Sequence, residues 1–596
     1  MFSLKTGFTN ERRFKLPSMK AASLPITQWK CSEGNQDIQG LLVRELGMTP
    51  ILSRILTSRH ILTLDDARKY LSPSLNDLHN PFLMKDMQKG VQRLIKAIYR
   101  QERVCVYGDY DADGITSVVI LLKFLRDMGH HVTYYIPDRT HEGYGLNRAA
   151  INKFKADDIS LVVTVDCGIS DHEQISYARS MGMDVIVLDH HEVPNTLPDA
   201  AAVINQNRTD CKFPFKRLAA VGIVFNFLIA LRGALRKEGF WANRKYPNLR
   251  EYLDLVALGT IGDISPLIDE NRIFAKIGLE LITEGNRIGI KALKEVCSVE
   301  SQVIDSGKAS FCLIPRINAA GRIASAGEAV QLLLTDDMDE ARDIANRLET
   351  YNRKRQSMEK AILAEILEEI DNSINPEEVG SLVFASYKWH PGVIGIVASR
   401  LVDRYYRPAI LISLRDGIGK GSGRSVSDFN IYQGLKKCDS LLLSYGGHRY
   451  AAGISIREED IQDFKVLLEQ VIREDMDVSD FISQTLIDAQ CDLQDINHEL
   501  MSQVGMLAPF GNHNPEPVLC VRNVHVSSQN IVGNNHLLMR ISRDGVSHNS
   551  IWFSKGQYIH SLSETAMDIA FTPQISYWNG ASNIQLKLKD MSHPAG

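Results

Sequence analysis

The sequence lacks regularly spaced cysteines and long hydrophobic runs. Its nine cysteines are scattered over 596 residues without a Cys-x-x-Cys pair. An odd count without regular spacing argues against a disulfide framework and against a structural zinc site. The most hydrophobic stretch, Val221 to Leu231, is interrupted by Asn226 and is far shorter than the roughly 20 residues of a membrane span. These absences exclude a disulfide-rich secreted scaffold and a membrane protein, and they indicate a reducing compartment, for which we expect the cytoplasm.

The sequence also has no excess of either charge. Its 67 Lys and Arg residues against 72 Asp and Glu residues give a net charge of −5, which offers no whole-chain argument for a polyanionic partner. A nucleic-acid site must therefore come from local clusters of basic residues. The composition, 44% hydrophobic and 23% charged, is that of a globular protein, and at roughly 150 residues per domain the length predicts about four units.

The first hundred residues divide into two predicted segments. Residues 1–40 begin with a basic stretch that lacks the apolar core of a signal peptide, and we predict a disordered leader there. Between residues 41 and 100 the apolar positions recur at helical spacing, which predicts a helical N-terminal segment.

Short strands and helices alternate between residues 101 and 310. The β-branched runs that predict the strands are 103–108, 131–137, 161–168 and 184–191. Strands that alternate with helices imply right-handed crossovers and a parallel sheet covered by helices. We therefore predict an α/β domain over this region.

The second half of the chain shows three further patterns. Residues 311–372 read as a helical connector, in which Met338 to Ile370 is highly charged, free of Gly and Pro, and predicts a long spacer helix. Residues 373–480 predict a second α/β domain. Residues 481–596 alternate like strands, with Asp544-Gly545 as a hairpin turn, and predict a small all-β barrel.

The strongest motif is an acidic cluster between a predicted strand and a predicted helix. Asp109, Asp111 and Asp113 stand at alternate positions between Gly108 and Gly114. An EF-hand loop begins in the same way, but its twelfth position requires a Glu where this chain has Ile120, and a helix where this chain has a strand. A solvated acidic turn is the ordinary interpretation of one such cluster.

The same residue types recur at the same place in the predicted topology. Asp166 ends one predicted strand, Asp189-His190-His191 ends another, and Asp263 follows a further apolar run. In an open α/β sheet, the carboxyl ends of the strands are the edge at which sites form. A lone histidine is usually structural, but this convergence favours a common site.

The chemistry of the cluster indicates metal-assisted hydrolysis of a phosphoester. Several carboxylates with one or two imidazoles suit Mn²⁺ or Mg²⁺ better than a structural zinc, and we interpret Cys167 as a packing residue. Two divalent cations neutralise so many carboxylates and activate water for attack on phosphorus.

A basic stretch supplies the local cluster that a polyanion requires. Residues 381–424 contain seven Lys and Arg residues against two acidic residues. Such an excess is often only a solvated face. The Gly-Ser-Gly-Arg-Ser turn is more specific, because glycines expose backbone N–H groups while Ser422 and Arg424 offer donors to a phosphate.

At these residues the sequence resembles the DHH phosphoesterase superfamily. The metal-site motifs that carry the resemblance are Asp109 to Gly114, Val165 to Gly168, Leu188 to His191 and Ala257 to Asp263. The following domain resembles DHHA1 through Tyr387 to Gly395, Gly421 to Ser425 and Ser444 to His448. The terminal barrel resembles an OB-fold.

Three further signatures narrow the resemblance to the single-strand-specific 5'-to-3' exonucleases of this superfamily. They are Pro315 to Arg322, Tyr351 to Gln356 and Ala508 to Val518. The resemblance covers the chain from about Gly40 to Lys589. One departure is His513, where the family commonly has Gly.

The resemblance implies a role for each matching residue. It implies that Asp111, Asp113, Asp166, His190 and Asp263 ligate two divalent cations, with Asp109 either a ligand or a residue behind the ligands. It implies catalytic roles for Asp166 and His191, the latter as a contact to the scissile phosphate or a proton shuttle.

The resemblance also implies how the strand is held. The residues expected to bind the substrate are Arg139, Arg316, Arg322, Gln356, His390, Ser422, Arg424 and His448. In the OB-fold, the candidates for tracking single-stranded DNA are Arg540, Trp552, Phe553, Tyr577, Trp578, Lys587 and Lys589.

The prediction is a metal-dependent exonuclease that releases 5'-mononucleotides from single-stranded DNA in repair and recombination. We expect a monomer, with a helicase and a single-strand-binding protein as partners and no membrane association. Two alternatives stay open: another phosphoesterase acting on short oligonucleotides or nucleotides, and an inactive DNA-binding scaffold. The length favours the exonuclease over the first, and the intact carboxylates and histidines favour it over the second.

Overall fold

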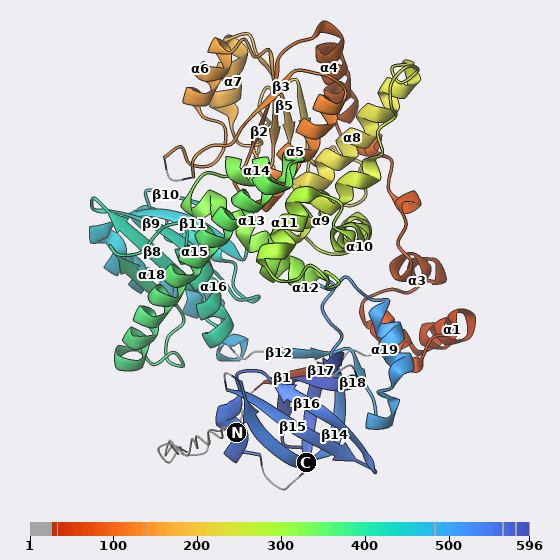
Figure 1. Ribbon diagram of the computed structural model, residues 1–596. Helices are drawn as coiled ribbons and strands as arrows, with labels where there is room; N and C mark the ends of the chain where they lie inside the picture. The colour runs from red at the N-terminus through yellow and green to blue at the C-terminus, as the bar shows by residue number, and fades with distance from the viewer. Residues whose placement is uncertain are drawn as a thin grey trace, which may run out of the picture. The chain divides into compact units, whose positions relative to one another are not determined.

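The computed structural model describes residues 27–31, 34–139, 141–481, 484–533, 535–562, 566–578 and 581–594 (Figure 1). The chain divides into two compact units. The larger comprises Arg68–Phe481 with Leu507–Glu516, and the smaller combines the described parts of Met1–Ala67, Ile482–Met506 and Pro517–Gly596. Among the described residues, no helix combines the length and the apolar character needed to cross a membrane.

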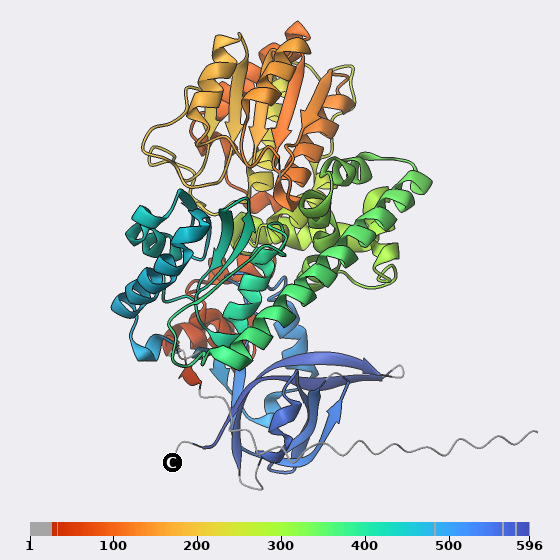
Figure 2. The same cartoon turned by 90° about the vertical axis from the view of Figure 1, so that its left-hand side faces the viewer.

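The larger unit contains the predicted parallel sheet, whose strands lie side by side in Figure 2. Its five strands lie in the order β3-β2-β4-β5-β6 and all pair in parallel. The strands are β2 (Val104–Gly108), β3 (Val132–Tyr135), β4 (Leu161–Val165), β5 (Asp184–Leu188) and β6 (Ala202–Ile204). The first four confirm the predicted strands, whereas β6 is an additional strand of three residues.

Helices cover both faces of this sheet because successive strand residues point to opposite sides. Val104 and Val106 pack against one set of helices, while Cys105 and Tyr107 pack against the other. The first face is covered by α4 (Met87–Arg100), α5 (Ala112–Asp127), α8 (Ala220–Lys237) and α9 (Leu253–Gly262). The second face is covered by α6 (Arg148–Ala156) and α7 (His172–Ser180).

A helical region follows and ends in the predicted spacer helix. Its elements are α10 (Asp269–Glu284), α11 (Ile288–Val296), α12 (Ser306–Lys308), the π-helical turn Ala309–Leu313, α13 (Ile314–Ile323), α14 (Gly327–Leu334) and α15 (Met338–Ser373). Asp337 caps α15 by accepting hydrogen bonds from the backbone N–H groups of Asp339 and Glu340. Helix α15 confirms the spacer and extends it to 36 residues.

The second sheet of the larger unit is mixed. Its order is β10-β11-β9-β8-β7, with β7 and β8 parallel and the other neighbours antiparallel. The strands are β7 (Leu382–Ser386), β8 (Ala409–Arg415), β9 (Ile418–Arg424), β10 (Ser444–Gly447) and β11 (Ala451–Arg457). The helices are α16 (Ile394–Tyr405), α17 (Ile431–Lys437) and α18 (Ile461–Asp475).

The smaller unit contains a closed five-stranded barrel, as the alternating pattern predicts. Pairing between the first and fourth of its strands closes the barrel. Its strands are β14 (Leu519–Val532), β15 (His536–Arg543), β16 (Val546–Trp552), β17 (Met567–Trp578) and β18 (Ala581–Ser592). Asp544 and Gly545 have φ angles of 48° and 79°, which confirms the predicted hairpin turn between β15 and β16.

The remaining elements of the smaller unit come from distant parts of the chain. They are β1 (Gln28–Cys31), α1 (Gln36–Leu46), α2 (Pro50–Ser58), β12 (Gln484–Ile487), β13 (Ala489–Gln490) and α19 (His498–Gly505), while α3 (Leu64–Leu71) crosses the boundary between the units. Strand β1 pairs in parallel with β12. The predicted disordered leader of residues 1–40 is therefore wrong for β1 and for the start of α1. Residues 1–26 lie outside the described part of the chain.

Candidate metal centre and phosphate pocket

The predicted acidic residues lie where the order of the parallel sheet reverses. Strand β3 lies on one side of β2 and β4 on the other, so the carboxyl ends of β2 and β4 form a topological switch point. Asp109 follows β2 directly, and Asp166 follows β4. The Asp189-His190-His191 segment follows the neighbouring β5. The parallel sheet thus brings three chain segments to one edge.

The acidic motif is fixed by hydrogen bonds to the starts of two helices. Asp111 caps α5, because its Oδ1 accepts hydrogen bonds from the backbone N–H groups of Asp113 and Gly114. Both carboxylate oxygens of Asp113 accept hydrogen bonds at 2.8 Å from backbone N–H groups at the start of α8. At Gly114, a Cβ atom would lie 2.5 Å from the backbone oxygen of Asp109. The glycine that ends the motif therefore permits this tight turn.

Three overlapping groups of side chains offer ligand atoms within 4.8 Å of one another. They are Asp109-Asp111-Asp166, Asp166-His190-His191 and Asp113-His190-Asp263. Together they contain all six predicted metal ligands and the predicted catalytic histidine. Asp166 and His190 each belong to two groups, which is the arrangement expected when neighbouring cations share ligands.

The electrostatics of the cluster fit a divalent cation. Oδ1 of Asp109 and Oδ1 of Asp166 are buried, and neither accepts a hydrogen bond from the described residues. Burial and the charge of Asp111 hold the pKa of Asp109 well above its usual range, and burial and the charge of Asp113 do the same to the pKa of Asp166. Burial and the charge of Asp263 raise the pKa of Asp113 to about 7. Bound cations would relieve both the burial cost and the repulsion.

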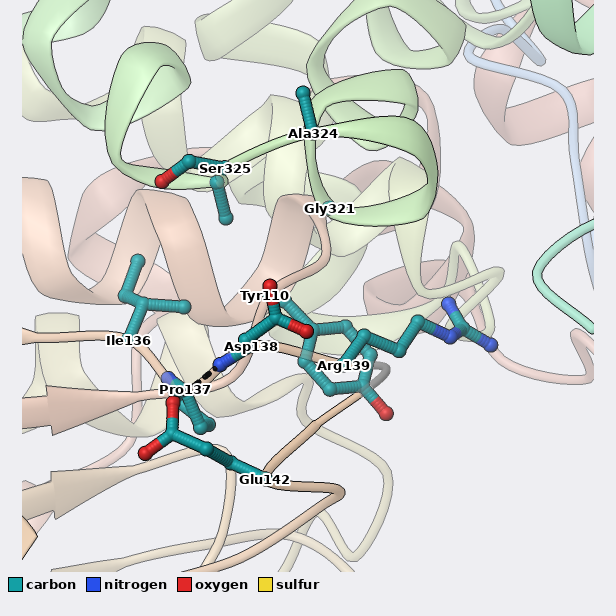
Figure 3. A pocket seen from close by; sticks show the side chains of 10 residues that line it. Tyr110, Ile136, Pro137, Asp138, Arg139, Glu142, Gly321, Ala324 and Ser325 are labelled. Atoms are coloured by element: carbon teal, nitrogen blue, oxygen red, sulfur yellow. Dashed lines mark hydrogen bonds between the residues drawn. The ribbon is translucent and has the colours of Figure 1, made fainter.

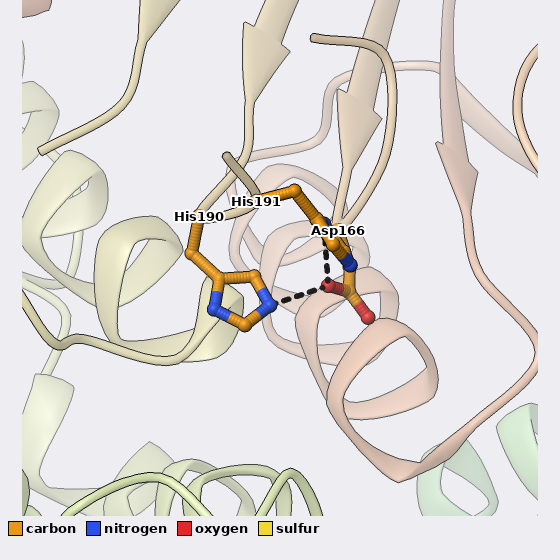
Figure 4. Close-up of side chains that lie close together, drawn as sticks. All are labelled: Asp166, His190 and His191. Carbon is orange, nitrogen blue, oxygen red and sulfur yellow. Dashed lines mark ion pairs between the residues drawn. The ribbon is translucent and has the colours of Figure 1, made fainter. Parts of the chain in front are cut away.

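Both histidines lie beside Asp166 (Figure 4), but each has a further partner of its own. Nε2 of His190 lies 3.2 Å from Oδ1 of Asp166, and its Nδ1 lies 3.9 Å from Oδ2 of Asp263. Nδ1 of His191 instead lies 2.7 Å from Oδ1 of the buried Asp189. Burial opposes the protonation of His191, but its hydrogen bond to Asp189 and the charge of that carboxylate raise its pKa to about 9. Asp189 thus orients His191 through Nδ1 and leaves Nε2 for another partner.

A group of arginines lies beside the acidic cluster. Burial and the charge of Arg139 lower the pKa of Arg322 to about 10, and Arg355 and Arg424 act in the same direction. Burial and Arg139 also lower the pKa of Arg424. Mutual repulsion between these half-buried guanidinium groups favours an anion among them. The predicted substrate residues Arg139, Arg322 and Arg424 therefore share one electrostatic environment.

The Gly-Ser-Gly-Arg segment, predicted as a turn, instead forms the end of strand β9, and it approaches α16 closely. Nη1 of Arg424 donates a hydrogen bond to Oγ of Ser422 at 3.0 Å. A Cβ atom at Gly395 would lie 2.7 Å from that hydroxyl and 3.0 Å from Nη2 of Arg424. The glycine at the start of α16 therefore leaves room for the two side chains predicted to bind phosphate.

Two predicted substrate residues lie on α13 and α15. Arg316 forms an ion pair with Glu349 at 2.7 Å, and it donates a hydrogen bond to the carbonyl oxygen of Cys312. Gln356 is exposed on α15. The carboxylate of Glu349, which no sequence motif singles out, therefore holds Arg316.

The two predicted histidines of the second sheet domain also lie near charged groups. His390 accepts a hydrogen bond from the backbone N–H of Gly392, and burial and the charge of Arg415 lower its pKa. The ring of His448 stacks on that of His191 with 6.1 Å between centroids, and its Nδ1 lies 3.5 Å from Glu192. The structure thus brings His448 beside the acidic centre.

A pocket joins the acidic motif to α13 (Figure 3). Tyr110 of the motif lines it together with Arg139 and with Gly321 of α13. The guanidinium carbon of Arg139 lies 4.8 Å from the centroid of the Tyr110 ring. This cation–π contact holds Arg139 next to the predicted metal ligands.

The OB-fold candidates separate into core and surface residues. Trp552 is 2% exposed and stacks on Tyr558, so it belongs to the barrel core, whereas Phe553 is 45% exposed. Arg540 donates hydrogen bonds to the hydroxyl of Ser547, and Lys587 and Lys589 lie on β18. The side chains of Tyr577 and Trp578 lie outside the described part of the structure.

Sequence reasoning missed several residues that shape the centre. Asp189 received no role, although it stands next to the two histidines. Tyr144 and Asp171 contact the centre or its supporting loop, and Asn318 accepts a hydrogen bond from the backbone N–H of Ala112 at the start of α5. The Gly-Tyr-Gly sequence at 143–145 was the available signal for Tyr144.

Family comparisons assign the three folded regions. Residues 103–260 match the N-terminal domain of the DHH family, residues 379–474 match the DHHA1 domain, and residues 487–590 match the RecJ OB domain. The fold and the acidic centre thus define a DHH-type phosphoesterase.

Relatives that match over most of the chain narrow this class. The chain is 36% identical to the single-stranded-DNA-specific exonuclease RecJ of Bacillus subtilis, over 94% of this chain and 70% of the relative. It is 34% identical to RecJ of Escherichia coli, over 90% of this chain and 95% of the relative. The chain belongs to the RecJ family of single-stranded-DNA-specific exonucleases.

Solved structures agree with this assignment. The crystal structure of Thermus thermophilus RecJ in complex with Mn²⁺ matches with a TM-score of 0.82 and 27% identity, over 96% of this chain and 80% of that chain. The complex of the same protein with Mg²⁺ matches with a TM-score of 0.76 and 26% identity. These cations are the ones that the carboxylate and imidazole ligands of this chain predict.

Proposed function

We propose that this protein is a metal-dependent exonuclease that degrades single-stranded DNA from its 5' end and releases 5'-mononucleotides. The observation that carries the proposal is the meeting of two opposite clusters within the larger unit. Buried and half-buried carboxylates form three potential cation sites, and half-buried arginines lie close enough for Arg139 to affect the pKa of Asp109. A phosphodiester strand suits both clusters at once.

The carboxylates would hold two cations of Mn²⁺ or Mg²⁺ type. Asp111, Asp113, Asp166, His190 and Asp263 are the proposed ligands. The unpaired Oδ1 of Asp109 supports adding this residue as a direct ligand. When bound, such cations neutralise the carboxylates, activate water for attack on phosphorus and stabilise the departing 3'-oxygen.

The side chains around this centre would place and assist the scissile group. His191 offers Nε2 to a phosphate oxygen or to a proton in transit, because Asp189 occupies its Nδ1. His448, stacked on His191, would line the same cleft. Asp166 acts as a ligand close to both histidines.

The arginine cluster would define the polarity of cleavage. Arg139, Arg322, Ser422 and Arg424 would bind the terminal 5'-phosphate, with Arg316 and Gln356 on the helical wall and His390 opposite the centre. A pocket that accepts a chain end favours exonucleolytic over internal cleavage. The OB-fold would track the following single strand with basic and aromatic side chains.

The experiment incubates the protein with labelled single-stranded DNA and Mn²⁺ beside the Asp166→Ala variant. The proposal predicts nucleotide release by the wild-type protein and a loss of at least about a hundredfold in the variant, because a shared cation ligand is removed. Release that is equal in both proteins would reject the assigned centre. A duplex of the same sequence, expected to resist, tests strand specificity.

A second candidate function keeps the centre but changes the substrate to short oligonucleotides or nucleotides. The pocket beside the acidic motif, which Tyr110 and Arg139 help to line, is the observation that favours it. Substrates of increasing length separate the candidates, because only an enzyme that uses its OB-fold binds long strands more tightly. An inactive scaffold would bind these strands without degrading them.

The cellular setting belongs to the same proposal. We propose a role in DNA repair and recombination, in the cytoplasm and as a monomer. A helicase and a single-strand-binding protein are the proposed partners, because a single-strand-specific enzyme needs an unwound substrate.

A further inference from the structure

A tyrosine outside the predicted ligand set reaches into the candidate centre. Tyr144 lies between β3 and α6, and its side chain is 50% exposed. Its hydroxyl donates a hydrogen bond to the backbone carbonyl of Asp166 at 3.0 Å. The same oxygen lies 3.2 Å from Nδ1 and 3.5 Å from Nε2 of His191. One hydroxyl therefore joins the end of β4 to the histidine that follows β5.

The loop that carries Tyr144 is shaped to present it. Gly143 and Gly145 on either side have φ angles of 82° and 85°, in the left-handed region that favours glycine. A Cβ atom at Gly145 would lie 2.7 Å from Oδ1 of Asp171. Neither glycine can therefore be replaced without strain, and this loop geometry directs the single side chain between them.

Two hydrogen bonds hold this loop from behind. The hydroxyl of the fully buried Tyr107 donates to the carbonyl oxygen of Gly145 at 2.7 Å. The backbone N–H of Leu146 donates to Oδ2 of Asp171 at 2.7 Å. The position of Tyr144 is thus set by the sheet and by the loop before α7, and not by its own exposed ring.

The hydrogen-bond capacity of the tyrosine defines what it does to His191. A phenol has one proton, and the carbonyl of Asp166 can only accept, so the proton points to that carbonyl. The lone pairs of the oxygen then face the imidazole nearest to Nδ1, so that Nε2 can still reach the phosphate. Asp189 already accepts from Nδ1 at 2.7 Å. Asp189 and Tyr144 together restrict the rotation of the His191 ring.

We infer that Tyr144 is a positioning residue that holds His191 in the orientation needed for phosphodiester hydrolysis. The inference rests on the proposed function, because it assigns His191 to the scissile phosphate. Tyr144 contacts Asp166 only through the backbone, so its hydroxyl acts on the histidine and not on the ligand oxygens. An oriented side chain contributes to the rate of the chemical step more than to substrate affinity.

The test compares Tyr144→Phe with the wild-type protein in single-turnover release of the first nucleotide. Phenylalanine keeps the ring and removes the hydroxyl. We expect the rate at saturating protein to fall about tenfold or more, with less than a twofold change in the half-saturating concentration. An unchanged rate, or a loss confined to affinity, would overturn the inference.

Tyr177→Phe is the matched control, because the hydroxyl of this half-buried tyrosine of α7 donates an exposed hydrogen bond to Asn152 of α6. It should retain the wild-type rate. Mn²⁺ affinity should also be unchanged in Tyr144→Phe. A weaker affinity would mean that Tyr144 acts through the cation ligands, which contradicts the assigned role.

A double-mutant cycle with His191→Ala separates the two partners of the hydroxyl. If Tyr144 acts through His191, adding Tyr144→Phe to His191→Ala costs little further rate. Additive losses would overturn the inference. An inactive wild-type protein would instead reject the proposed function, so the two failures remain distinguishable.

Discussion

At the scale of single residues, buried carboxylates differ in whether both oxygens have a hydrogen-bond partner. Asp109 and Asp166 each carry a buried oxygen that accepts no hydrogen bond from the described residues, and their pKa values are raised. Asp189 is equally buried, but its hydrogen bond from His191 overcomes the effect of burial and lowers its pKa to about 2. The first two residues are therefore proposed as cation ligands, whereas Asp189 already has its partner.

A buried glutamate away from the centre predicts a pH effect on stability. Glu270 is fully buried on α10 and accepts hydrogen bonds from the side chain of Asn226 and the backbone N–H of His79. Burial nevertheless raises its pKa from 4.5 to about 7. The folded protein therefore binds this proton more tightly than the unfolded chain. The resulting stabilisation is complete below pH 4.5 and is lost as the pH rises through about 7.

Glu270→Gln should remove this dependence. The melting temperature of the variant, relative to that of the wild type, should rise as the pH increases from 4.5 to 7. The corresponding change in relative unfolding free energy should reflect at most one proton. The measurement is a series of thermal melts across this range. Glu280→Gln, at an exposed position of the same helix, is the control. Parallel curves for Glu270→Gln and wild type would contradict the prediction.

The sequence singles out the proposed ligands, which the structure brings together, but not the residues that support them. Asp109, Asp166 and His190 could be proposed because their types suit a cation and their places follow predicted strands. Tyr144 and Glu349 were missed because tyrosines and glutamates are common on surfaces. Their roles arise from contacts with segments distant in the chain, such as Arg316, which no local pattern reveals.

At the scale of elements, α15 joins two hydrophobic cores of the larger unit. Its first half packs through residues such as Ile344 and Leu348 into the core of the parallel-sheet domain. Its second half packs through Ile362 and Ile366 into the core beside α16. The charged segment between these two halves forms ion pairs with arginines of the helices on either side of it. Helix α15 is therefore part of the candidate phosphate site.

A substitution at Glu349 of α15 tests whether this helix is part of the candidate phosphate site. It forms ion pairs with Arg316 of α13 and Arg353 of its own helix. Glu349→Gln should raise the KM for 5'-phosphorylated single strands severalfold with little change in kcat, because Arg316 loses its fixed position. Strands with a 5'-hydroxyl should be affected less.

Glu368→Gln, at an exposed site on the same helix, provides the matched control and should behave as wild type. Equal effects of Glu349→Gln on phosphorylated and unphosphorylated strands would contradict a role in holding the terminal phosphate.

The length and locality of an element decided whether it was predictable. Helix α15 was predicted because 36 residues without Gly or Pro give a long periodic pattern. Strand β6 was missed because it has three residues. Strand β1 was missed because it pairs with β12, more than 450 positions later in the chain, and such pairing leaves no local signal.

At the scale of the whole molecule, the net charge of −5 averages two opposed sites. The carboxylates at the sheet edge form one, and the arginines around Arg322 form the other. A slightly acidic protein can therefore bind a polyanion, provided that cations neutralise the first site and the strand meets the second.

Removal of divalent cations should affect both stability and activity. In EDTA the buried carboxylates repel one another, so the wild-type protein should melt at a lower temperature than in Mn²⁺ and should release no nucleotides. Asp166→Asn should show a much smaller difference between the two conditions, because it weakens binding and relieves repulsion. An equal shift in Asp166→Asn would contradict the assigned ligand.

The central claim is that the carboxylate centre and the arginine pocket act together on the 5' end of a single strand. Its most direct test follows the products of 5'-labelled single-stranded DNA, supplied with Mn²⁺, from the first turnover. The account predicts that the first labelled product is a 5'-mononucleotide whatever the length of the strand. Labelled oligonucleotides of varied length, or labelled inorganic phosphate, would contradict it.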